Sequence, residues 1–132
     1  MKRLALYTVV GWELAWWARR LALRKKVFAC AVDRARFLGR PLVVIGAPDR
    51  GPTAGYPCGD ITVDLGPSQC PRTIQVDISA GIPLQSDSSV VFVSCTLEYV
   101  PDLKAALGEI QRIAGSMDNV FIIRVEPWTL TA

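Results

Sequence analysis

The sequence predicts an α/β protein with a mostly parallel, Rossmann-like sheet of about five strands, preceded by N-terminal helices. Short apolar runs rich in β-branched residues recur beyond residue 40, as expected of strands that are buried on both faces of a parallel sheet. A segment with apolar residues at helical spacing separates the last two runs. The 132 residues, 51% hydrophobic and 20% charged, suit one folded domain better than a disordered chain.

Basic residues are concentrated near the N-terminus. Residues 1–40 hold ten lysines and arginines but only two acidic residues, whereas residues 41–132 hold five basic and ten acidic residues. The apolar run Leu4–Ala18, which is followed by a basic cluster, predicts one helix, and Val27–Leu38 predicts a second that ends at Gly39. We therefore divide the chain into a basic, tryptophan-rich helical arm (1–40) and a small α/β domain (41–132).

The first 26 residues predict a docking segment, with three alternatives for its role. Trp12, Trp16 and Trp17 precede a cluster of cations, which is typical of a helix lying in a membrane interface. A helix that packs on the domain, or on a partner protein within a larger assembly, is the second alternative. A signal peptide is the third, but Glu13 and the bulky tryptophans oppose it, and no small-x-small cleavage site is clear.

The same segment does not predict a membrane span. A spanning helix needs about 20 apolar residues, and the apolar run here is shorter and carries Glu13. Its tryptophans precede the cations instead of alternating with them, so nucleic acid is not an expected partner. We therefore expect a cytoplasmic protein that is peripheral at a membrane or held within an assembly.

Five strands and one helix are expected in the α/β domain. The strands are Pro41–Ala47, Asp60–Leu65, Thr73–Ile78, Val90–Cys95 and Asn119–Val125. The helix spans Asp102–Ala114, with Gly115 as its stop. Pro48–Gly59 is rich in glycine and proline and predicts a loop. Gly66–Arg72 is short for a parallel crossover, which leaves parallel and mixed pairing open at this point.

The chain lacks the usual residues for zinc binding and for histidine-based acid–base catalysis. It has no histidine, and its four cysteines include no Cys-x-x-Cys pair, so no metal site is expected. Cys58 and Cys70 could pair in an oxidising compartment, but four cysteines in an ordinary domain are more often free thiols, which is what we expect. Cys95 is expected to be a buried thiol at a strand end.

One segment, Thr73–Gly115, carries an ordered set of short motifs. Along the chain they are Asp77, Ile82-Pro83-Leu84, Asp87-Ser88-Ser89, the strand Val90–Val93, Ser94–Val100 and Pro101-Asp102-Leu103. This order resembles the second half of a class I S-adenosylmethionine-dependent methyltransferase core, of the small methyltransferase type 11-like kind. The resemblance implies a Rossmann-like fold whose ligand lies beyond the C-terminal ends of the strands.

The resemblance implies that S-adenosylmethionine is the cofactor, and it assigns residues to the methionine end. Gly46 and Ala47 match the glycine-rich turn after the first strand, whose backbone approaches the cofactor closely. Ser94 begins the segment that follows the fourth strand and lies beside the methionine portion. The chain departs from the family at Pro48, where a second glycine is usual, and proline lacks the conformational freedom of glycine.

Three further residues are matched to the nucleoside. Asp64 matches the acidic residue that holds the ribose hydroxyls, because a carboxylate can accept two hydrogen bonds at once; Asp60 is the alternative if the strand register differs. Asp77 matches the residue that recognises the adenine amino group. Ile78 is then a possible apolar contact for the ring.

The resemblance implies a methyltransferase-like protein with an unidentified acceptor. Cys95 and Tyr99 stand where the family has histidines, and no residue is matched as a catalytic base or nucleophile. Methyl transfer can proceed mainly by proximity and alignment, so a missing base does not exclude catalysis. The alternative is a non-catalytic module with the methyltransferase fold, docked to a membrane or a larger assembly through its N-terminal helix.

Overall fold

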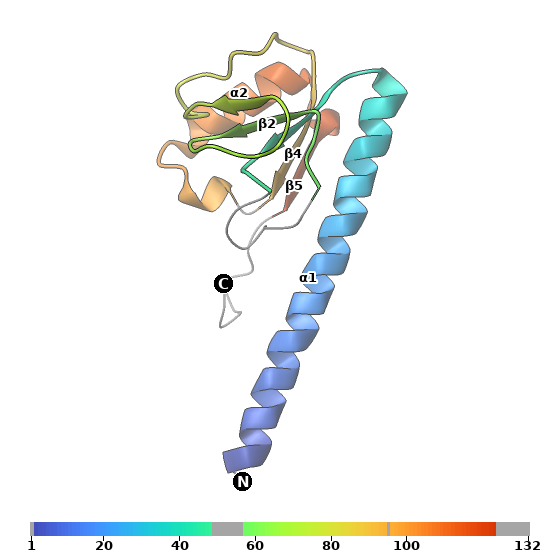
Figure 1. The fold of residues 1–132 in the computed structure, drawn as a ribbon, viewed down its shortest axis with the longest axis vertical. Helices are drawn as coiled ribbons and strands as arrows, with labels where there is room; N and C mark the ends of the chain where they lie inside the picture. The colour runs from blue at the N-terminus through green and yellow to red at the C-terminus, as the bar shows by residue number, and fades with distance from the viewer. Residues whose placement is uncertain (1, 49–56, 95, 124–132) are drawn as a thin grey trace.

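The computed structural model describes residues 2–48, 57–94 and 96–123 of the chain (Figure 1). Its main elements, in chain order, are α1 (Lys2–Leu38), β1 (Leu42–Ile45), β2 (Ile61–Asp64), β3 (Thr73–Gln75), β4 (Val90–Ser94), α2 (Leu103–Ala114) and β5 (Val120–Ile123). Two short 3₁₀ turns, η2 (Leu97–Tyr99) and η3 (Met117–Asn119), flank α2.

The five strands form one parallel sheet in the order β3-β2-β1-β4-β5. The predicted α/β, Rossmann-like class is therefore confirmed. Strands β2 and β3 pair in parallel, with Thr62 opposite Thr73 and Asp64 opposite Gln75, which settles the pairing that the short 66–72 connection left open. The chain proceeds outward from β1 to β3 and then returns to β4 on the other side of β1, so the strand order reverses between β1 and β4.

A single helix replaces the two that the sequence predicts at the N-terminus. Helix α1 runs without a break from Lys2 to Leu38, so the prediction of separate helices at Leu4–Ala18 and Val27–Leu38 is wrong in number. The residues between them read RRLALRKK, and because all of them favour helix, nothing interrupts the backbone hydrogen bonds. Gly39 ends α1 with a φ of 65°, as predicted.

The C-terminal half of α1 covers one face of the sheet. Ala31 and Ala35 are buried against β1 and β4, where their small side chains allow the helix to approach closely. Phe28 packs edge-on against Phe92 of β4, with 5.1 Å between the ring centroids. This half of the predicted arm is therefore part of the core of the domain. The N-terminal half continues past the sheet (Figure 1).

Helix α2 covers the opposite face of the sheet. Ala106 and Ile110 are fully buried in a cluster with residues of β1, β2 and β4. Asp102 caps the helix, since its side chain accepts a hydrogen bond from the Ala105 N–H over 3.1 Å. Gly115 follows the last turn with a φ of 77°. The predicted helix and its stop are confirmed.

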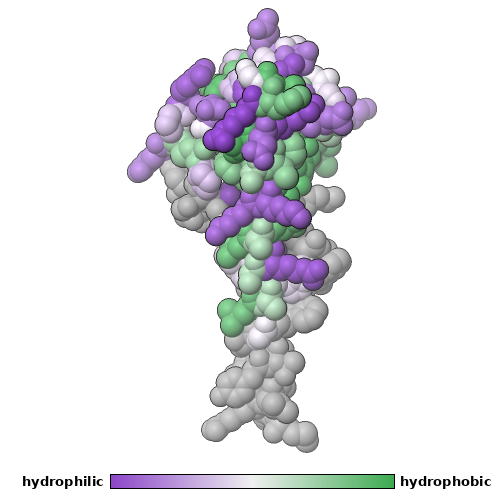
Figure 2. Space-filling model, turned by 90° about the vertical axis from the view of Figure 1, so that its right-hand side faces the viewer, coloured by the Kyte–Doolittle hydropathy of each residue, from purple (hydrophilic) through white to green (hydrophobic). Residues whose placement is uncertain are grey.

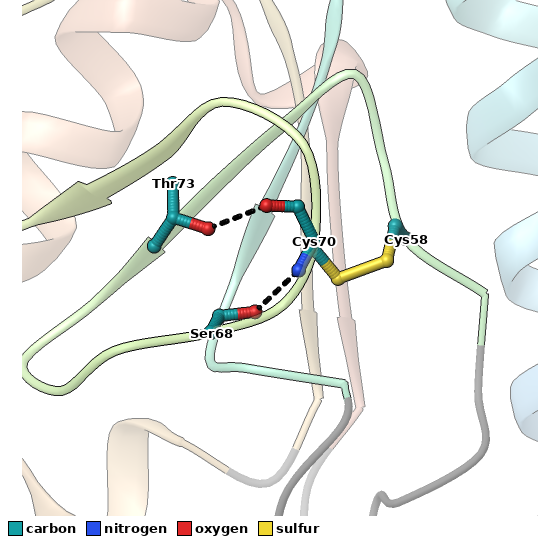
Figure 3. Close-up of a disulfide and its surroundings, with 4 residues drawn as sticks. All are labelled: Cys58, Ser68, Cys70 and Thr73. Atoms are coloured by element: carbon teal, nitrogen blue, oxygen red, sulfur yellow. Dashed lines mark hydrogen bonds between the residues drawn. A yellow bond between two sulfur atoms is a disulfide. The ribbon is translucent and has the colours of Figure 1, made fainter.

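Cys58 and Cys70 form a disulfide (Figure 3), so the expectation that both are free thiols is wrong. Cys58 lies before β2 and Cys70 before β3, and the parallel pairing of these strands brings their amino ends together. Ser68 Oγ accepts a hydrogen bond from the Cys70 N–H over 3.1 Å, and Thr73 Oγ1 donates to the Cys70 carbonyl over 2.9 Å. The bond therefore joins the entries to two neighbouring strands.

The strands are shorter than the sequence predicts. Strand β3 ends at Gln75, three residues before the predicted end, because the backbone turns at Asp77. Most of the predicted 48–59 loop, together with Cys95 and residues beyond 123, falls outside the described residues. Within the described ranges, no helix has both the length and the apolar character that crossing a membrane requires.

Candidate functional site

Three of the residues matched to the cofactor lie in one row at the carboxyl edge of the sheet. Ile45, the last residue of β1, pairs with Val63 of β2 on one side and with Val93 of β4 on the other. Gly46, which follows β1, therefore lies between Asp64 at the end of β2 and Ser94 at the end of β4. Strands β1 and β4 flank the reversal of strand order, where open α/β sheets bind their ligands.

Gly46 has a backbone conformation that favours glycine. Its φ is 93°, and its N–H donates to the Val63 carbonyl over 2.8 Å. A Cβ at this position would overlap Thr96 Oγ1. That hydroxyl lies 3.3 Å from the Ile45 carbonyl oxygen and 3.1 Å from the Ser94 carbonyl oxygen, which hold it beside Gly46. The glycine is therefore required both by its φ and by the close approach of Thr96.

The two residues after Gly46 are turned into the protein. The side chains of Ala47 and Pro48 are buried, and Pro48 is among the most completely covered residues of the domain. Pro48 has no N–H to offer a ligand, whereas a glycine at this position would have one. The contribution of this turn to a ligand site is thus centred on Gly46.

The two aspartates considered for the ribose lie at opposite ends of β2. Asp64 ends the strand at the carboxyl edge and is half-buried. Asp60 precedes the strand at the amino edge, where its Oδ2 accepts a hydrogen bond from the Leu42 N–H over 2.8 Å. Asp60 is thus excluded as a partner of a ligand at the carboxyl edge, and it serves instead to hold the start of β1 beside β2.

Asp77 follows β3 on the same side of the sheet as Asp64. Its side chain is exposed, and Oδ1 accepts hydrogen bonds from the Ser79 hydroxyl over 2.6 Å and from the Ser79 N–H over 2.9 Å. These bonds lower the pKa of Asp77 below its ordinary value of 3.8. Oδ2 receives neither of them. Ile78, by contrast, is only 6% exposed and packs in the core beneath α2.

Ser94 makes a contact that the sequence analysis missed. Its Oγ accepts a hydrogen bond from Arg24 Nε over 3.2 Å, and Arg24 is only 5% exposed although it belongs to the basic cluster of α1. The guanidinium carbon lies 5.2 Å from the centroid of the Phe92 ring. Arg24 lies one helical turn before Phe28, which packs on the sheet. Because Lys25 and Lys26 beside it are also cationic, the sequence alone did not distinguish Arg24 from its neighbours.

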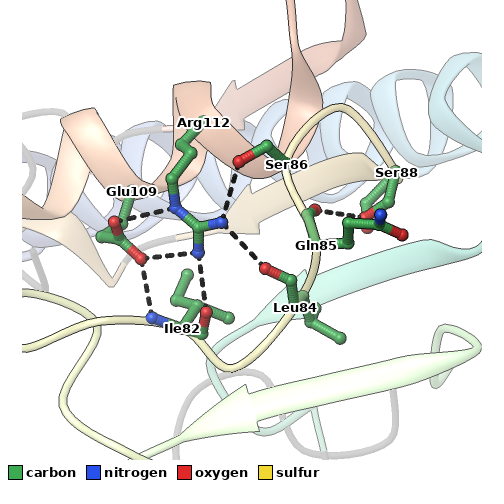
Figure 4. A network of polar contacts seen from close by, with 8 residues as sticks. Ile82, Leu84, Gln85, Ser86, Ser88, Glu109 and Arg112 are labelled. Atoms are coloured by element: carbon green, nitrogen blue, oxygen red, sulfur yellow. Dashed lines mark hydrogen bonds and ion pairs between the residues drawn. The ribbon is translucent and has the colours of Figure 1, made fainter.

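The loop after Asp77 is fastened to α2 by a polar network (Figure 4). Arg112 donates to the carbonyl oxygens of Ile82 and Leu84 over 2.7 and 2.9 Å, and Glu109 accepts from the Ile82 N–H over 2.7 Å. Hydrogen bonds from Arg112 and from the Ile82 N–H lower the pKa of Glu109, and the carboxylate raises the pKa of Arg112. The network fixes the segment that leads from the candidate site into β4.

Comparison with protein-family models, with curated proteins and with solved structures finds no match to this chain. In the parts of the chain that the structure describes, no three acidic or cysteine side chains gather as they would around a metal ion.

Proposed function

We propose that this protein binds S-adenosylmethionine at the carboxyl edge of its sheet, as a methyltransferase-like domain with an unidentified acceptor. In this proposal the Asp64 carboxylate holds the ribose hydroxyls, and Asp77 Oδ2 accepts a hydrogen bond from the adenine amino group. Gly46 allows the cofactor to approach the backbone at the end of β1. The observation that carries the proposal is the row of Gly46, Asp64 and Ser94 at the reversal of strand order.

Two further observations support a nucleoside as the ligand. Asp64 and Asp77 end or follow adjacent parallel strands, and the Val76 N–H, next to Asp77, donates to the Asp64 carbonyl over 3.0 Å, so the backbones at the two residues are neighbours on one edge. Because Asp77 Oδ1 accepts hydrogen bonds from the N–H and the hydroxyl of Ser79, the orientation of the Asp77 carboxylate is fixed before a ligand binds.

The methionine end of the cofactor would lie near Gly46 and Ser94. Arg24 places a buried cation against Ser94 Oγ and so holds the end of β4 at this edge. No side chain at this edge is proposed as a catalytic base. Catalysis, if the cofactor is bound with an acceptor, would depend on holding the two groups in line.

The test is calorimetric titration of the full chain with S-adenosylhomocysteine, the demethylated product. Asp64→Asn should weaken binding by about tenfold or more, because the amide accepts fewer hydrogen bonds from the ribose and carries no charge. Asp60→Asn is the matched control, since the amide oxygen can still accept from the Leu42 N–H at the opposite end of β2. Equal binding by the two variants, or none by the wild type at millimolar ligand, would refute the proposal.

A second candidate function, docking of the domain as a non-catalytic module, is favoured by the exposed side chains of α1. Leu14 and Trp17, in the half of the helix that continues past the sheet, are 65% and 42% exposed, and Leu23, just beyond it, is 52% exposed. Figure 2 shows apolar and charged residues mixed along this part of α1. A helix that is apolar on several sides is usually buried in a partner, so we propose that this half inserts into a membrane surface or a larger assembly.

Docking can be tested without shortening the chain. We expect replacement of Leu14, Trp17 and Leu23 by serine to abolish flotation with anionic vesicles, or to reduce the size of the native assembly in light scattering. The matched control replaces Phe37, Leu103 and Met117 by serine; these are exposed apolar residues outside the 14–23 stretch of α1. If both triple variants behave like the wild type, α1 does not dock the protein.

A further inference from the structure

An open cleft of about 570 Å³ lies at the amino edge of the sheet, at the opposite end of β1 from the candidate cofactor site. Its walls come from the C-terminal half of α1, from the link between α1 and β1, and from the residues that precede β2 and β3. Its volume is within the range of small-molecule sites in proteins. None of the residues assigned to the cofactor lines it.

Three arginines from separate segments converge on this cleft. They are Arg36 in the last turn of α1, Arg40 in the link to β1, and Arg72 immediately before β3. Arg40 is anchored, because it forms an ion pair with Asp87 over 2.9 Å and a hydrogen bond to the Ala114 carbonyl over 3.3 Å. Both Arg36 and Arg72 are exposed residues that line the cleft, and in the described residues neither has a carboxylate partner.

The backbone around Arg72 is fixed by two constraints. Arg72 has a φ of 52°, an uncommon value for a residue with a side chain, and its carbonyl accepts a hydrogen bond from the Thr62 N–H over 3.3 Å. The disulfide between Cys58, which lines the cleft, and Cys70 lies two residues away. The wall that carries Arg72 is therefore held in place, which reduces the ordering that a ligand would have to impose.

The wall formed by α1 and β1 is apolar. Phe28, Val32 and Ala35 lie along one side of α1, and Leu42 faces them from β1. Asp60 also lines the cleft, where its carboxylate accepts a hydrogen bond from the Leu42 N–H. Because Arg40 is paired with Asp87, the charges of Arg36 and Arg72 are set against the single charge of Asp60. The cleft thus combines an apolar wall with a net positive charge.

We infer that this cleft binds a small organic phosphate whose apolar group lies against Phe28, Val32 and Leu42. Planar guanidinium groups match the oxygen geometry of phosphate and can donate two hydrogen bonds each. Arg36 and Arg72 would supply the donors, while Arg40 stays paired with Asp87 at the margin of the cleft. An inorganic anion would leave the apolar wall and most of the volume unused, so a phosphate ester fits the cleft better than free phosphate.

The test uses phenyl phosphate and inorganic phosphate as probes, titrated into the full oxidised chain and followed by calorimetry at fixed ionic strength. We expect phenyl phosphate to bind at least tenfold more tightly than inorganic phosphate. The double substitution Arg36→Gln and Arg72→Gln should reduce phenyl phosphate affinity by at least tenfold. Lys25→Gln with Lys26→Gln is the matched control, because it removes the same charge from exposed positions of α1 outside the cleft.

Each outcome decides the inference. It is supported if only the arginine double variant loses affinity while its thermal midpoint stays that of the wild type. Equal losses in the arginine and lysine variants would mean unspecific attraction to a basic surface and would overturn it. Equal affinities for the two probes would also overturn it, since the apolar wall would then contribute nothing. Absence of binding to wild-type protein at millimolar phenyl phosphate would do the same.

Discussion

Arg24 Nε of helix α1 lies 3.2 Å from Ser94 Oγ at the carboxyl end of β4, and both residues are almost completely buried. This contact joins the basic arm to the edge where the strand order reverses. Because the guanidinium also lies over the Phe92 ring, Arg24 acts as part of the core rather than as a solvated cation. The arm and the candidate site are therefore physically coupled.

Substitution of Arg24 by alanine should destabilise the domain. It removes a charged hydrogen bond to Ser94 and the packing over Phe92, for an expected loss of about 2–3 kcal/mol in the free energy of unfolding. Ser94→Ala should cost about 1 kcal/mol. Urea denaturation of both variants and of the double variant measures the coupling between the two side chains. Strictly additive losses would show that the contact contributes nothing.

Gly46→Ala should be destabilising for two separable reasons. Its positive φ and the overlap of the new Cβ with Thr96 Oγ1 together predict a loss of about 2–4 kcal/mol. Adding Thr96→Ala removes the overlap but leaves the φ, so the double variant should lose less than the sum. Gly108→Ala, in the middle of α2 with open space around it, is the matched control and should stabilise by about 0.5–1 kcal/mol. Equal effects at the two glycines would contradict this explanation.

Reduction of the disulfide should lower stability without changing the fold. Cys58 and Cys70 are 12 residues apart. A disulfide that closes a loop of this size adds about 2–4 kcal/mol to the free energy of unfolding, because it restricts the unfolded chain. The urea midpoint should therefore fall when dithiothreitol is added. A Cys58→Ser, Cys70→Ser variant should start at the lower midpoint and show no response to the reductant. A wild-type midpoint that is insensitive to dithiothreitol would contradict the assignment of this bond.

Acid should weaken the network between α2 and the loop after β3. The hydrogen bond from Arg112 lowers the pKa of Glu109 below its ordinary value of 4.5, so the folded state binds this proton less readily than the unfolded state. The carboxylate therefore stabilises the fold above about pH 4.5, and this contribution is lost as the pH falls through the lowered pKa.

The variant Glu109→Gln isolates this effect. At pH 7 it should be less stable than the wild type by about 1–2 kcal/mol, because the ion pair with Arg112 is lost and the guanidinium donates to a neutral amide oxygen instead of a carboxylate. Urea denaturation between pH 7 and pH 3 should show the difference shrinking as the solution becomes acidic. Parallel stability curves over the whole range would mean that Glu109 has no role in the acid response.

The sheet and α2 could be predicted from the sequence because local patterns determine them. β1 and β4 are continuous apolar runs buried on both faces, and α2 has its cap at Asp102 and its stop at Gly115. The number of N-terminal helices could not be predicted in the same way. The change from apolar to basic residues near Arg19 marks where the environment of α1 changes, but the backbone continues as helix because the residues there all favour it.

The candidate site was only partly predictable for a related reason. The sequence places Asp64 and Asp77 near the ends of predicted strands. It does not say whether Asp64 or Asp60 lies at the edge where a ligand would bind, because that depends on the strand register. The contact between Arg24 and Ser94 spans 70 residues. No local pattern records such a contact. The disulfide was missed because it depends on the pairing of β2 with β3, which the short connection between them left open.

The most direct test of the proposed cofactor site is the location of the bound ligand. Titration of the ¹⁵N-labelled full chain with S-adenosylhomocysteine should shift the amide resonances of Gly46, Asp64 and Asp77, at the carboxyl edge. Those of Gly59 and Asp60, at the amino edge, should stay unchanged. No shifts at millimolar ligand, or shifts confined to the amino edge, would contradict the proposal that this sheet binds S-adenosylmethionine at its carboxyl edge.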